Sequence, residues 1–226
     1  MTDRSDQKPK RLRFLVPAAI AGALAGLGAV YVMDTGKGNP DVATKVVANG
    51  SCPAVAGRSE RLKDLVKGEI AALSLASAPV PLDGLVFAGP DGAEKTLADF
   101  KGRAVLLNLW ATWCPPCRAE MPSLDRLEGE LGSEAFEVVT VNIDTRDPEK
   151  PKKFFEEIAV QHLTRYADPT AAIFKDLRGM NLAFGMPTTL VVDADGCLVG
   201  HMAGGAEWDS GEAKALLGEI IGERRS

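Results

Sequence analysis

The hydrophobic pattern changes along the chain, and each change predicts a different kind of element. Ala104–Trp110 is an almost continuous apolar run, as expected of a central strand buried on both faces of a sheet. Phe136–Asn142 and Thr188–Val192 also have the composition of strands. Elsewhere, apolar residues recur three and four positions apart, which is typical of amphipathic helices. Helices are predicted over 58–75, 114–131, 148–158, 170–178 and 210–221.

Turn residues separate these elements. Leu85–Phe87 is a short predicted strand followed by the turn Gly89–Gly92, and Thr96–Gly102 forms a compact helical turn. Asp193–Gly196 is a hairpin turn that leads into a last strand, Cys197–Met202. Because strands alternate with helices up to this late antiparallel hairpin, the pattern predicts an α/β fold with a mixed central sheet flanked by helices.

An uncharged segment near the N-terminus predicts a membrane anchor. Phe14–Met33 contains no charged side chain and has the roughly 20 residues that a helix needs to cross a bilayer. Residues 1–13 carry five basic and two acidic groups, whereas residues 34–226 carry 21 basic and 29 acidic groups. A basic flank stays on the cytoplasmic side, so we predict a single-pass protein of the cytoplasmic (inner) membrane with its body in the periplasm. A cleaved signal peptide ending near Ala23–Ala25 is the alternative, although the apolar run continues beyond it.

The same pattern divides the chain into four parts. These are the cytoplasmic N-terminus 1–13, the transmembrane helix 14–33, a stalk with an extra N-terminal helix over 34–78, and the main domain 79–222. The whole chain is mildly acidic, with 26 basic and 31 acidic side chains. It lacks the basic clustering that nucleic-acid binding requires, so we expect no nucleic-acid partner.

Four cysteines lie in the exported part, where disulfides are chemically permitted, and four can pair in three ways: Cys52, Cys114, Cys117 and Cys197. Cys114 and Cys117 form a CxxC pair that follows the buried strand and opens a helix. A thiolate at a helix N-terminus is stabilised by unpaired N–H groups and by the helix dipole, which lowers the pKa of the thiol. We therefore predict that Cys114, at the exposed helix start, attacks disulfides, and that Cys117 is the shielded resolving residue.

A CxxC pair also occurs in zinc sites and in static disulfides. A structural zinc site needs four ligands, and besides cysteine the sequence offers only His162 and His201, neither of them near another ligand in the sequence. A static disulfide is disfavoured because a strand-to-helix junction is exposed and reactive. We expect no metal site and no cofactor. Pro115 and Pro116 provide no N–H to the Cys114 thiolate, which favours a higher thiol pKa and a more reducing couple than in a strong oxidant.

The segment from Asn108 to Pro122, NLWATWCPPCRAEMP, resembles the active-site segment of thioredoxin-fold proteins of the TlpA group. Gly185–Thr188 resembles the loop that carries the cis-proline of that fold. The resemblance extends over about 79–221. It implies a thioredoxin-like domain that works outside the cytoplasmic membrane, with Pro187 as the cis-proline that faces the cysteines and presents backbone to a substrate peptide.

The resemblance also implies roles for residues near the cysteines. Trp113 would shield the attacking sulfur and, with Met186, contact the substrate, although a tryptophan is often buried in a core. Glu120 lies on the same helical face as Cys117. It would set the acidity of the cysteines and relay protons, unless it is simply a solvated helix residue. Thioredoxin has a buried aspartate at the position of Asn108, so any buried-acid role is absent or falls to Glu120.

Cys52 precedes the extra N-terminal helix, and Cys197 opens the last strand. The simplest interpretation is a structural disulfide that pins the helix to the domain, because two idle thiols would be a liability in an oxidising compartment. A second redox relay is the alternative.

These features together predict a thiol–disulfide oxidoreductase that reduces specific client proteins. By resemblance, the clients are a copper chaperone or a copper-site subunit in cytochrome oxidase assembly, or proteins of cytochrome c assembly, and a membrane reductant supplies the electrons. A copper-binding module is the alternative, because the thiolates of Cys114 and Cys117 suit Cu(I), but no Met/His cluster accompanies them. A peptide-binding chaperone with vestigial redox chemistry is a third possibility.

Overall fold

The computed structural model describes Cys52 and residues 55–223. The predicted transmembrane helix 14–33 and most of the predicted stalk lie outside the described residues. Among the residues that are described, none of the helices is both long enough and apolar enough to cross a bilayer.

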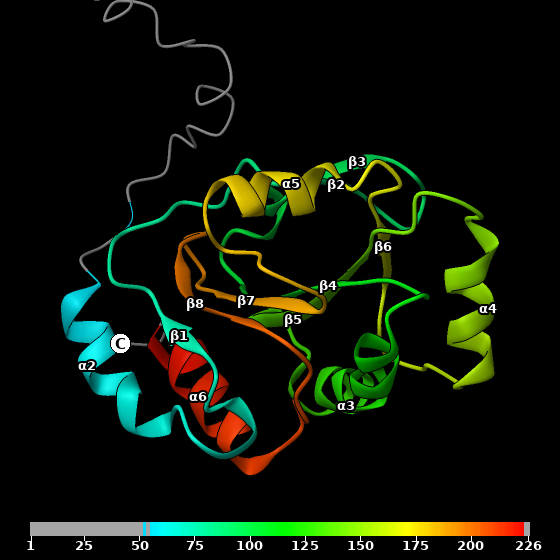
Figure 1. The fold of residues 1–226 in the computed structure, drawn as a ribbon. Helices are drawn as coiled ribbons and strands as arrows, with labels where there is room; N and C mark the ends of the chain where they lie inside the picture. Colours follow the sequence, from blue (N-terminus) through cyan, green and yellow to red (C-terminus); the bar gives the residue numbers. More distant parts are fainter. Residues whose placement is uncertain (1–51, 53–54, 224–226) are drawn as a thin grey trace, which may run out of the picture. The chain divides into compact units, whose positions relative to one another are not determined.

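An eight-stranded mixed sheet forms the centre of the domain (Figure 1), with the order β1-β8-β7-β4-β5-β6-β2-β3. The strands are β1 (Ser74–Leu75), β2 (Val86–Ala88), β3 (Glu94–Thr96), β4 (Ala104–Trp110), β5 (Phe136–Asn142), β6 (Arg165–Ala167), β7 (Thr188–Val192) and β8 (Leu198–Ala203). Strands β4, β5 and β6 run parallel, and the other neighbours are antiparallel. The predicted α/β fold with a mixed sheet is confirmed.

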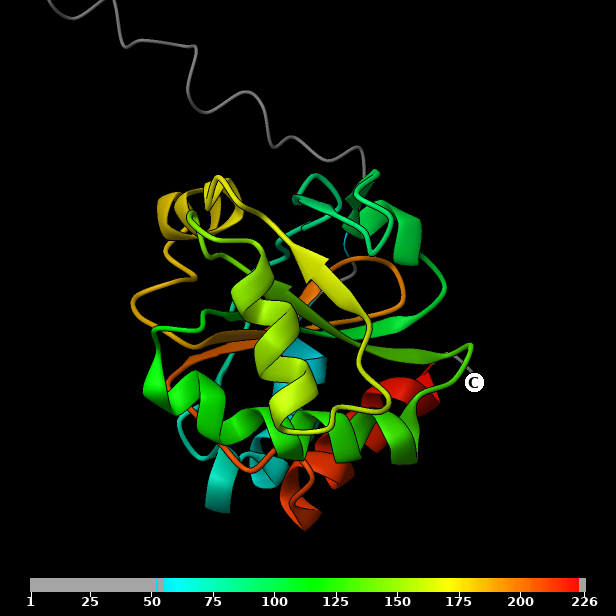
Figure 2. The same ribbon diagram turned by 90° about the vertical axis from the view of Figure 1, so that its right-hand side faces the viewer.

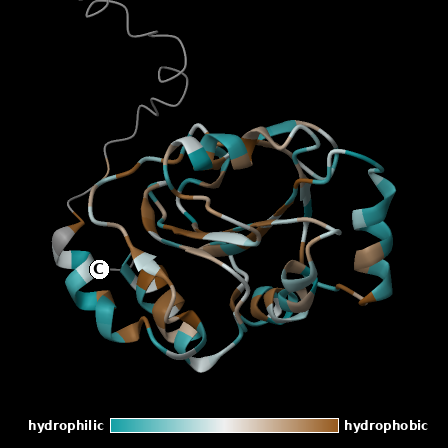
Figure 3. Cartoon of the chain, viewed as in Figure 1, coloured by the Kyte–Doolittle hydropathy of each residue, from teal (hydrophilic) through white to brown (hydrophobic). Residues whose placement is uncertain are grey.

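Helices cover both faces of this sheet. They are α2 (Ala56–Leu62), α3 (Pro115–Leu131), α4 (Glu149–Glu157), α5 (Ala172–Gly179) and α6 (Gly211–Gly222), with single 3₁₀ turns η1 (Lys63–Leu65), η2 (Gly68–Ile70) and η3 (Leu97–Phe100). In Figure 1, α3 and α6 lie on one side of the central strands and α5 on the other, and Figure 2 shows the same separation after a 90° turn. Polar residues dominate the outer helix α4, whereas α6 is largely apolar (Figure 3).

Strand β4 lies in the middle of the core because all seven of its residues are buried. It pairs with β5 on one side and with β7 on the other, so its backbone groups are satisfied within the sheet. On the α3 face, Met121, Leu124 and Leu127 are fully buried. Full burial of a leucine side chain contributes roughly 1.5–3 kcal/mol. The start of α3 is therefore held at a fixed place above the end of β4.

The N-terminal segment differs from the single helix predicted over 58–75, and that prediction is wrong beyond Leu62. Helix α2 ends there, and the chain continues through η1 and η2 into β1. Gly68 has a φ of +57°, and a Cβ atom at this position would lie 2.5 Å from the Glu212 carboxylate on α6. Only glycine combines this backbone conformation with so close an approach. Strand β1 pairs with β8, so the end of segment 34–78 belongs to the sheet.

The structure also contains three short strands that the sequence pattern did not predict. Strands β1, β3 and β6 have only two or three residues each. A run of this length is too short to show the alternation of apolar and polar residues that identifies a strand. The remaining predicted helices and strands are present within about two residues of their predicted bounds, as is usual for element ends.

A disulfide joins Cys52 to Cys197 at the start of β8, with 5.7 Å between their Cα atoms. Next to it, the Arg58 guanidinium on α2 lies 2.6 Å from the Asp193 carboxylate and 3.0 Å from that of Glu223. Asp193 also accepts hydrogen bonds from two backbone N–H groups of its own turn. The N-terminal segment is thus tied covalently and electrostatically to the β7–β8 hairpin and to the end of α6.

Replacement of both Cys52 and Cys197 by alanine is expected to lower the free energy of unfolding by about 2–4 kcal/mol, because their disulfide closes a long loop. The measurement is urea unfolding of the oxidised protein. The double variant Cys114→Ala/Cys117→Ala is the control, because its disulfide links cysteines only three positions apart and constrains the unfolded chain far less. Equal losses in the two double variants would contradict the structural role of the long-range bridge.

Candidate active site

The CxxC pair lies where β4 passes into α3. Cys114 is the N-cap residue of α3, with φ −100° and ψ 102°, and its Sγ accepts a hydrogen bond from the Cys117 N–H at 3.3 Å. Pro115 and Pro116 occupy the first helical positions, where a missing N–H costs nothing because it has no intrahelical partner. The two cysteines form a disulfide with 5.3 Å between their Cα atoms. The structure therefore shows the oxidised form of the pair.

Exposure near the pair differs from the prediction in one respect. Cys114 is only 3 % exposed and Cys117 is fully buried. The predicted exposure of Cys114 is therefore wrong for this oxidised form, because the disulfide and the Cys117 N–H turn its sulfur toward the helix. Trp113 is 64 % exposed. It is not a core tryptophan, and its indole is available to a partner next to the attacking cysteine.

The predicted proline loop leaves the sheet at the same edge as the cysteines. The peptide bond between Met186 and Pro187 is cis. Thr188 on β7 pairs with Leu109 on β4, so the residues before Thr188 and those after β4 emerge from adjacent strands. The Pro187 carbonyl accepts a hydrogen bond from the Gly204 N–H beyond β8. Pro187 is buried and Met186 is half-buried.

Glu120 is the buried acid of this site, which excludes the alternative that it is a solvated helix residue. Its side chain is 2 % exposed, one turn along α3 from Cys117. Its Oε1 accepts from Asn108 Nδ2 of β4 at 2.8 Å. Its Oε2 accepts from the Ala206 N–H and from Trp208 Nε1, each at 3.2 Å. Strand β4, helix α3 and the loop after β8 thus meet at one carboxylate.

Burial of Glu120 raises its pKa from 4.5 to about 7, because desolvation of the charged form outweighs the three hydrogen bonds that favour it. The nearby Glu207 carboxylate raises the pKa further. Glu120 also lines a cavity of about 250 Å³ together with Pro116, Gly205 and the exposed Glu69 of η2. This carboxyl exchanges its proton near neutral pH, and the cavity gives it a route to solvent.

Sequence reasoning missed several residues that build the site. Trp208 is completely buried and donates to Glu120, and Thr189 accepts a second hydrogen bond from Asn108 Nδ2 at 2.9 Å. No local motif marks either residue, because both reach the site only through the sheet topology. Phe184 precedes the cis-proline and is 71 % exposed. An aromatic residue close to the recognised Gly185–Thr188 segment was a signal available in the sequence.

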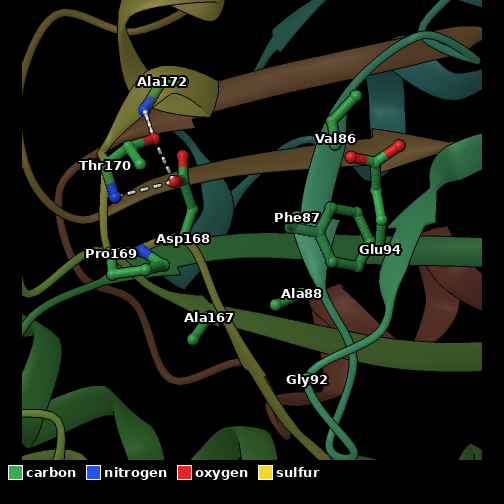
Figure 4. Close-up of a pocket in the computed structure, with 10 residues that line it drawn as sticks. All are labelled: Val86, Phe87, Ala88, Gly92, Glu94, Ala167, Asp168, Pro169, Thr170 and Ala172. Carbon is green, nitrogen blue, oxygen red and sulfur yellow. Dashed lines mark hydrogen bonds between the residues drawn. The ribbon is translucent and has the colours of Figure 1, made fainter.

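A second cavity, of about 310 Å³, lies between the β2–β3 hairpin and the loop from β6 to α5 (Figure 4). The Asp168 carboxylate in its wall accepts from the Thr170 N–H and hydroxyl and from the Ile173 N–H. Phe87 and Glu94 lie across the cavity on the hairpin (Figure 4). These bonds order the turn before α5 and the first residues of that helix, so Asp168 has a structural role here.

Among the described residues, no group of three or more His, Cys, Asp or Glu side chains is placed to hold a metal ion. The copper-binding alternative therefore rests on the two thiols of Cys114 and Cys117 alone, and these are joined in a disulfide here.

Residues 75–217 match the Redoxin family, so the chain belongs to that family. It is 37 % identical over 110 residues to the thioredoxin-like protein YneN of Bacillus subtilis, which covers 47 % of this chain and 60 % of YneN. It is 32 % identical over 139 residues to the thiol-disulfide oxidoreductase ResA of Halalkalibacterium halodurans, which covers 58 % of this chain and 72 % of that protein. The ResA of Bacillus thuringiensis is 30 % identical over 118 residues, which is 50 % of this chain and 62 % of that relative. The chain thus spans about three fifths of the length of YneN and of the Bacillus thuringiensis protein.

The fold also matches solved structures. A putative thiol:disulfide interchange protein DsbE from Chlorobium tepidum superposes with a TM-score of 0.56 at 26 % identity, over 66 % of this chain and 100 % of that one. A thioredoxin family protein from the same organism gives a TM-score of 0.53 at 24 % identity, over 65 % of this chain and 99 % of that one. The domain therefore has the predicted thioredoxin-like fold.

Replacement Glu120→Gln is expected to change how stability depends on pH. The folded state binds the Glu120 proton more tightly than the unfolded state, so the contribution of Glu120 to stability falls by about 3 kcal/mol as the pH rises from 4.5 to about 7. Glutamine does not titrate, so the stability of the variant relative to the wild type rises over this pH interval. Urea unfolding at intervals between those pH values measures the effect, and parallel stability curves for the two proteins would contradict the raised pKa.

Proposed function

We propose that this protein is a membrane-anchored thiol–disulfide oxidoreductase that reduces cysteine pairs in exported client proteins. The observation that carries the proposal is the disulfide of Cys114 and Cys117 at the N-cap of α3, with the Glu120 carboxyl buried one turn further along the helix. The names of the ResA relatives, thiol-disulfide oxidoreductases, support the same activity.

The reaction begins with the reduced pair. The Cys114 thiolate attacks one sulfur of the client disulfide, so that a mixed disulfide forms and the second client sulfur leaves as a thiol. Cys117 then attacks Cys114 Sγ and releases the first client sulfur. The client has gained two electrons and two protons, and the Cys114–Cys117 disulfide is the product. A membrane reductant, as the resemblance to the TlpA group implies, returns two electrons and restores both thiols.

Glu120 supports the second step as a proton acceptor. Cys117 is fully buried, so its thiol has no direct access to water. It attacks only as a thiolate, and its proton has to leave through the protein. The Glu120 carboxyl lies one helical turn away with a pKa of about 7, and it borders the cavity of about 250 Å³. The proton passes from Cys117 to Glu120 and from there to solvent. In the reverse reaction the same carboxyl returns it.

The exposed side chains near the pair suit a protein client. Trp113 and Phe184 are 64 % and 71 % exposed, on the two loops that flank the active-site edge of the sheet. Large exposed aromatic residues of this kind are typical of surfaces that bind other proteins. Pro187 precedes β7 at the same edge, and because its carbonyl already accepts from Gly204, the half-buried Met186 before it would present its backbone to an extended client segment.

The sequence supports the proposed location and clients. The apolar segment 14–33 and its basic flank support an inner-membrane anchor with the domain in the periplasm. The resemblance of Asn108–Pro122 to the TlpA group supports clients that carry copper-site cysteines in cytochrome oxidase assembly, or cysteine pairs in cytochrome c assembly. The match to DsbE-like structures is consistent with a role outside the cytoplasm, where protein disulfides form.

The potential of the Cys114–Cys117 couple tests the direction of electron flow. We expect a value below about −200 mV, closer to thioredoxin than to a strong oxidant, because Pro115 and Pro116 withhold two N–H donors from the Cys114 thiolate. The measurement is equilibration of the full chain with glutathione buffers, followed by fluorescence of Trp113. A potential near −120 mV, typical of an oxidant such as DsbA, would overturn the reducing role and leave the cysteine chemistry in place.

Single cysteine replacements test the order of attack. Cys117→Ser is expected to trap a covalent adduct with a disulfide-bonded protein such as insulin, because the mixed disulfide on Cys114 has no resolving thiol. Cys114→Ser is the matched control and should trap at least tenfold less, since Cys117 lies inside α3 and lacks the N-cap position that stabilises a thiolate. Non-reducing gel electrophoresis with mass spectrometry measures the adduct. Equal trapping by both variants would show that Cys114 is not the preferred nucleophile.

A further inference from the structure

The buried Glu120 carboxyl has two oxygens with different neighbours. Oε2 accepts from the Ala206 N–H and from Trp208 Nε1, each at 3.2 Å. Backbone amides and indoles are donors only. A proton placed on Oε2 would therefore point at one of two N–H groups that cannot accept it. When Glu120 is protonated, the proton has to sit on Oε1.

Oε1 also faces a donor, but one that is able to reverse. Asn108 Nδ2 lies 2.8 Å from Oε1 and donates to it, as an ionised carboxylate requires. The side-chain amide carries an acceptor oxygen and a donor nitrogen on the same flat group. Half a turn about its last side-chain bond puts Oδ1 in the place of Nδ2, where it accepts from a protonated Oε1. We propose that Asn108 reverses its amide whenever Glu120 gains or loses its proton, and so holds the buried acid in both states.

The residues beside Asn108 are able to follow this reversal. Nδ2 also donates to the Thr189 hydroxyl at 2.9 Å. A hydroxyl both donates and accepts, so Thr189 donates to Oδ1 once the amide has turned. Asn108 pairs with Thr189 on β7 and with Thr140 on β5, so the three side chains lie side by side on one face of the sheet.

Thr140 completes the arrangement on the other side. The Asn108 amide directs Nδ2 toward Thr189 on β7, which leaves Oδ1 on the side away from Thr189. Within the described residues, both Asn108 Oδ1 and Thr140 Oγ1 are buried without a hydrogen-bond partner. The two atoms are therefore not hydrogen-bonded to each other. An orphaned buried acceptor is costly. After reversal Nδ2 turns away from Thr189 toward the β5 side, where Thr140 is the residue paired with Asn108. Asn108 thus has a threonine on each side, and reversal gives its Oδ1 the partners Glu120 and Thr189 that it lacks in the present orientation.

The charged groups around Glu120 do not bond to Oε1, so the orientation of the Asn108 amide depends on the protonation of Glu120. Glu207 follows Ala206 in the loop beyond β8, and Glu69 of η2 lines the cavity that reaches Glu120. Arg126 of α3 lies 3.6 Å from the Glu207 carboxylate and offsets part of its charge. All three are exposed side chains that bias the proton without bonding to Oε1. Asparagine at position 108 also avoids a second buried carboxylate, which would oppose ionisation of Glu120.

This inference refines the proposed function, because a proton acceptor that is stable in both charge states suits repeated transfer to and from Cys117. It also stands apart from that function, because the reversal depends only on the protonation of Glu120. Asn108 is a positioning residue, because it acts on the reacting sulfurs only through Glu120.

The test is NMR spectroscopy of the oxidised full chain, with labelled asparagine side-chain amides and threonine methyl groups. At about pH 9 the Asn108 amide protons should show a nuclear Overhauser contact to the Thr189 methyl group. At about pH 5 this contact should weaken at least threefold, and a contact to the Thr140 methyl group should replace it, with a midpoint near the pKa of Glu120 at about 7. An unchanged contact pattern across this range would overturn the proposal.

Glu120→Gln is the decisive variant, because it mimics the protonated acid. Its carbonyl oxygen takes the two donors Ala206 and Trp208, and its NH₂ group faces Asn108 and requires Oδ1 there. The Thr140 contact is therefore expected at both pH values. A Thr189 contact in this variant, or a surviving pH switch, would refute the reversal.

Asn108→Leu adds an independent measurement of the Glu120 titration by infrared spectroscopy of its carboxyl group. If Asn108 bonds both the protonated and the ionised form of Glu120, its removal moves the pKa of Glu120 by less than about one unit. If Asn108 donates only to the ionised form, its removal raises the pKa by more than that. Exchange with glutathione, measured on the same samples, separates the two proposals. A chain that reverses Asn108 but exchanges no disulfide would defeat the proposed function and leave this inference standing.

Discussion

A carboxylate buried beneath a reactive disulfide is the constraint around which this domain is organised. Without its donors, Glu120 would face a desolvation cost of several kcal/mol in its charged form. Asn108, Ala206 and Trp208 supply these donors from β4 and from the loop beyond β8. The same elements fix α3 over the end of β4, so the support of the acid and the placement of Cys114 depend on one another.

The clamp on the N-terminal segment extends this organisation to the periphery. Cys52–Cys197 and the Arg58 ion pairs bind the segment to the β7–β8 hairpin and to the end of α6. The segment then contributes β1 to the sheet and Glu69 to the cavity beside Glu120. The long-range disulfide therefore stabilises the part of the molecule that borders the cavity beside Glu120.

The chain belongs to the Redoxin family and has the thioredoxin-like fold, and the surroundings of the CxxC pair define the character of the chemistry proposed for it. Two prolines withhold N–H groups from Cys114, and a buried acid with a pKa near 7 lies next to Cys117. Both features disfavour a strongly stabilised thiolate. They are consistent with a reductant of selected clients and with proton exchange on the inner side of the active-site helix.

The amino-acid sequence by itself determined the elements that carry the site, because local periodicity and a strand-to-helix CxxC are readable along the chain. The resemblance to the TlpA group left any buried-acid role either absent or with Glu120, because Asn108 stands where thioredoxin has an aspartate. Only the tertiary structure decided that Glu120 is buried, that Trp208 holds it and that Thr140 and Thr189 flank Asn108. These contacts join residues that lie 12 to 88 positions apart in the sequence, or residues that are paired on adjacent strands. Strand order and register create such neighbours, and short-range sequence patterns do not encode them.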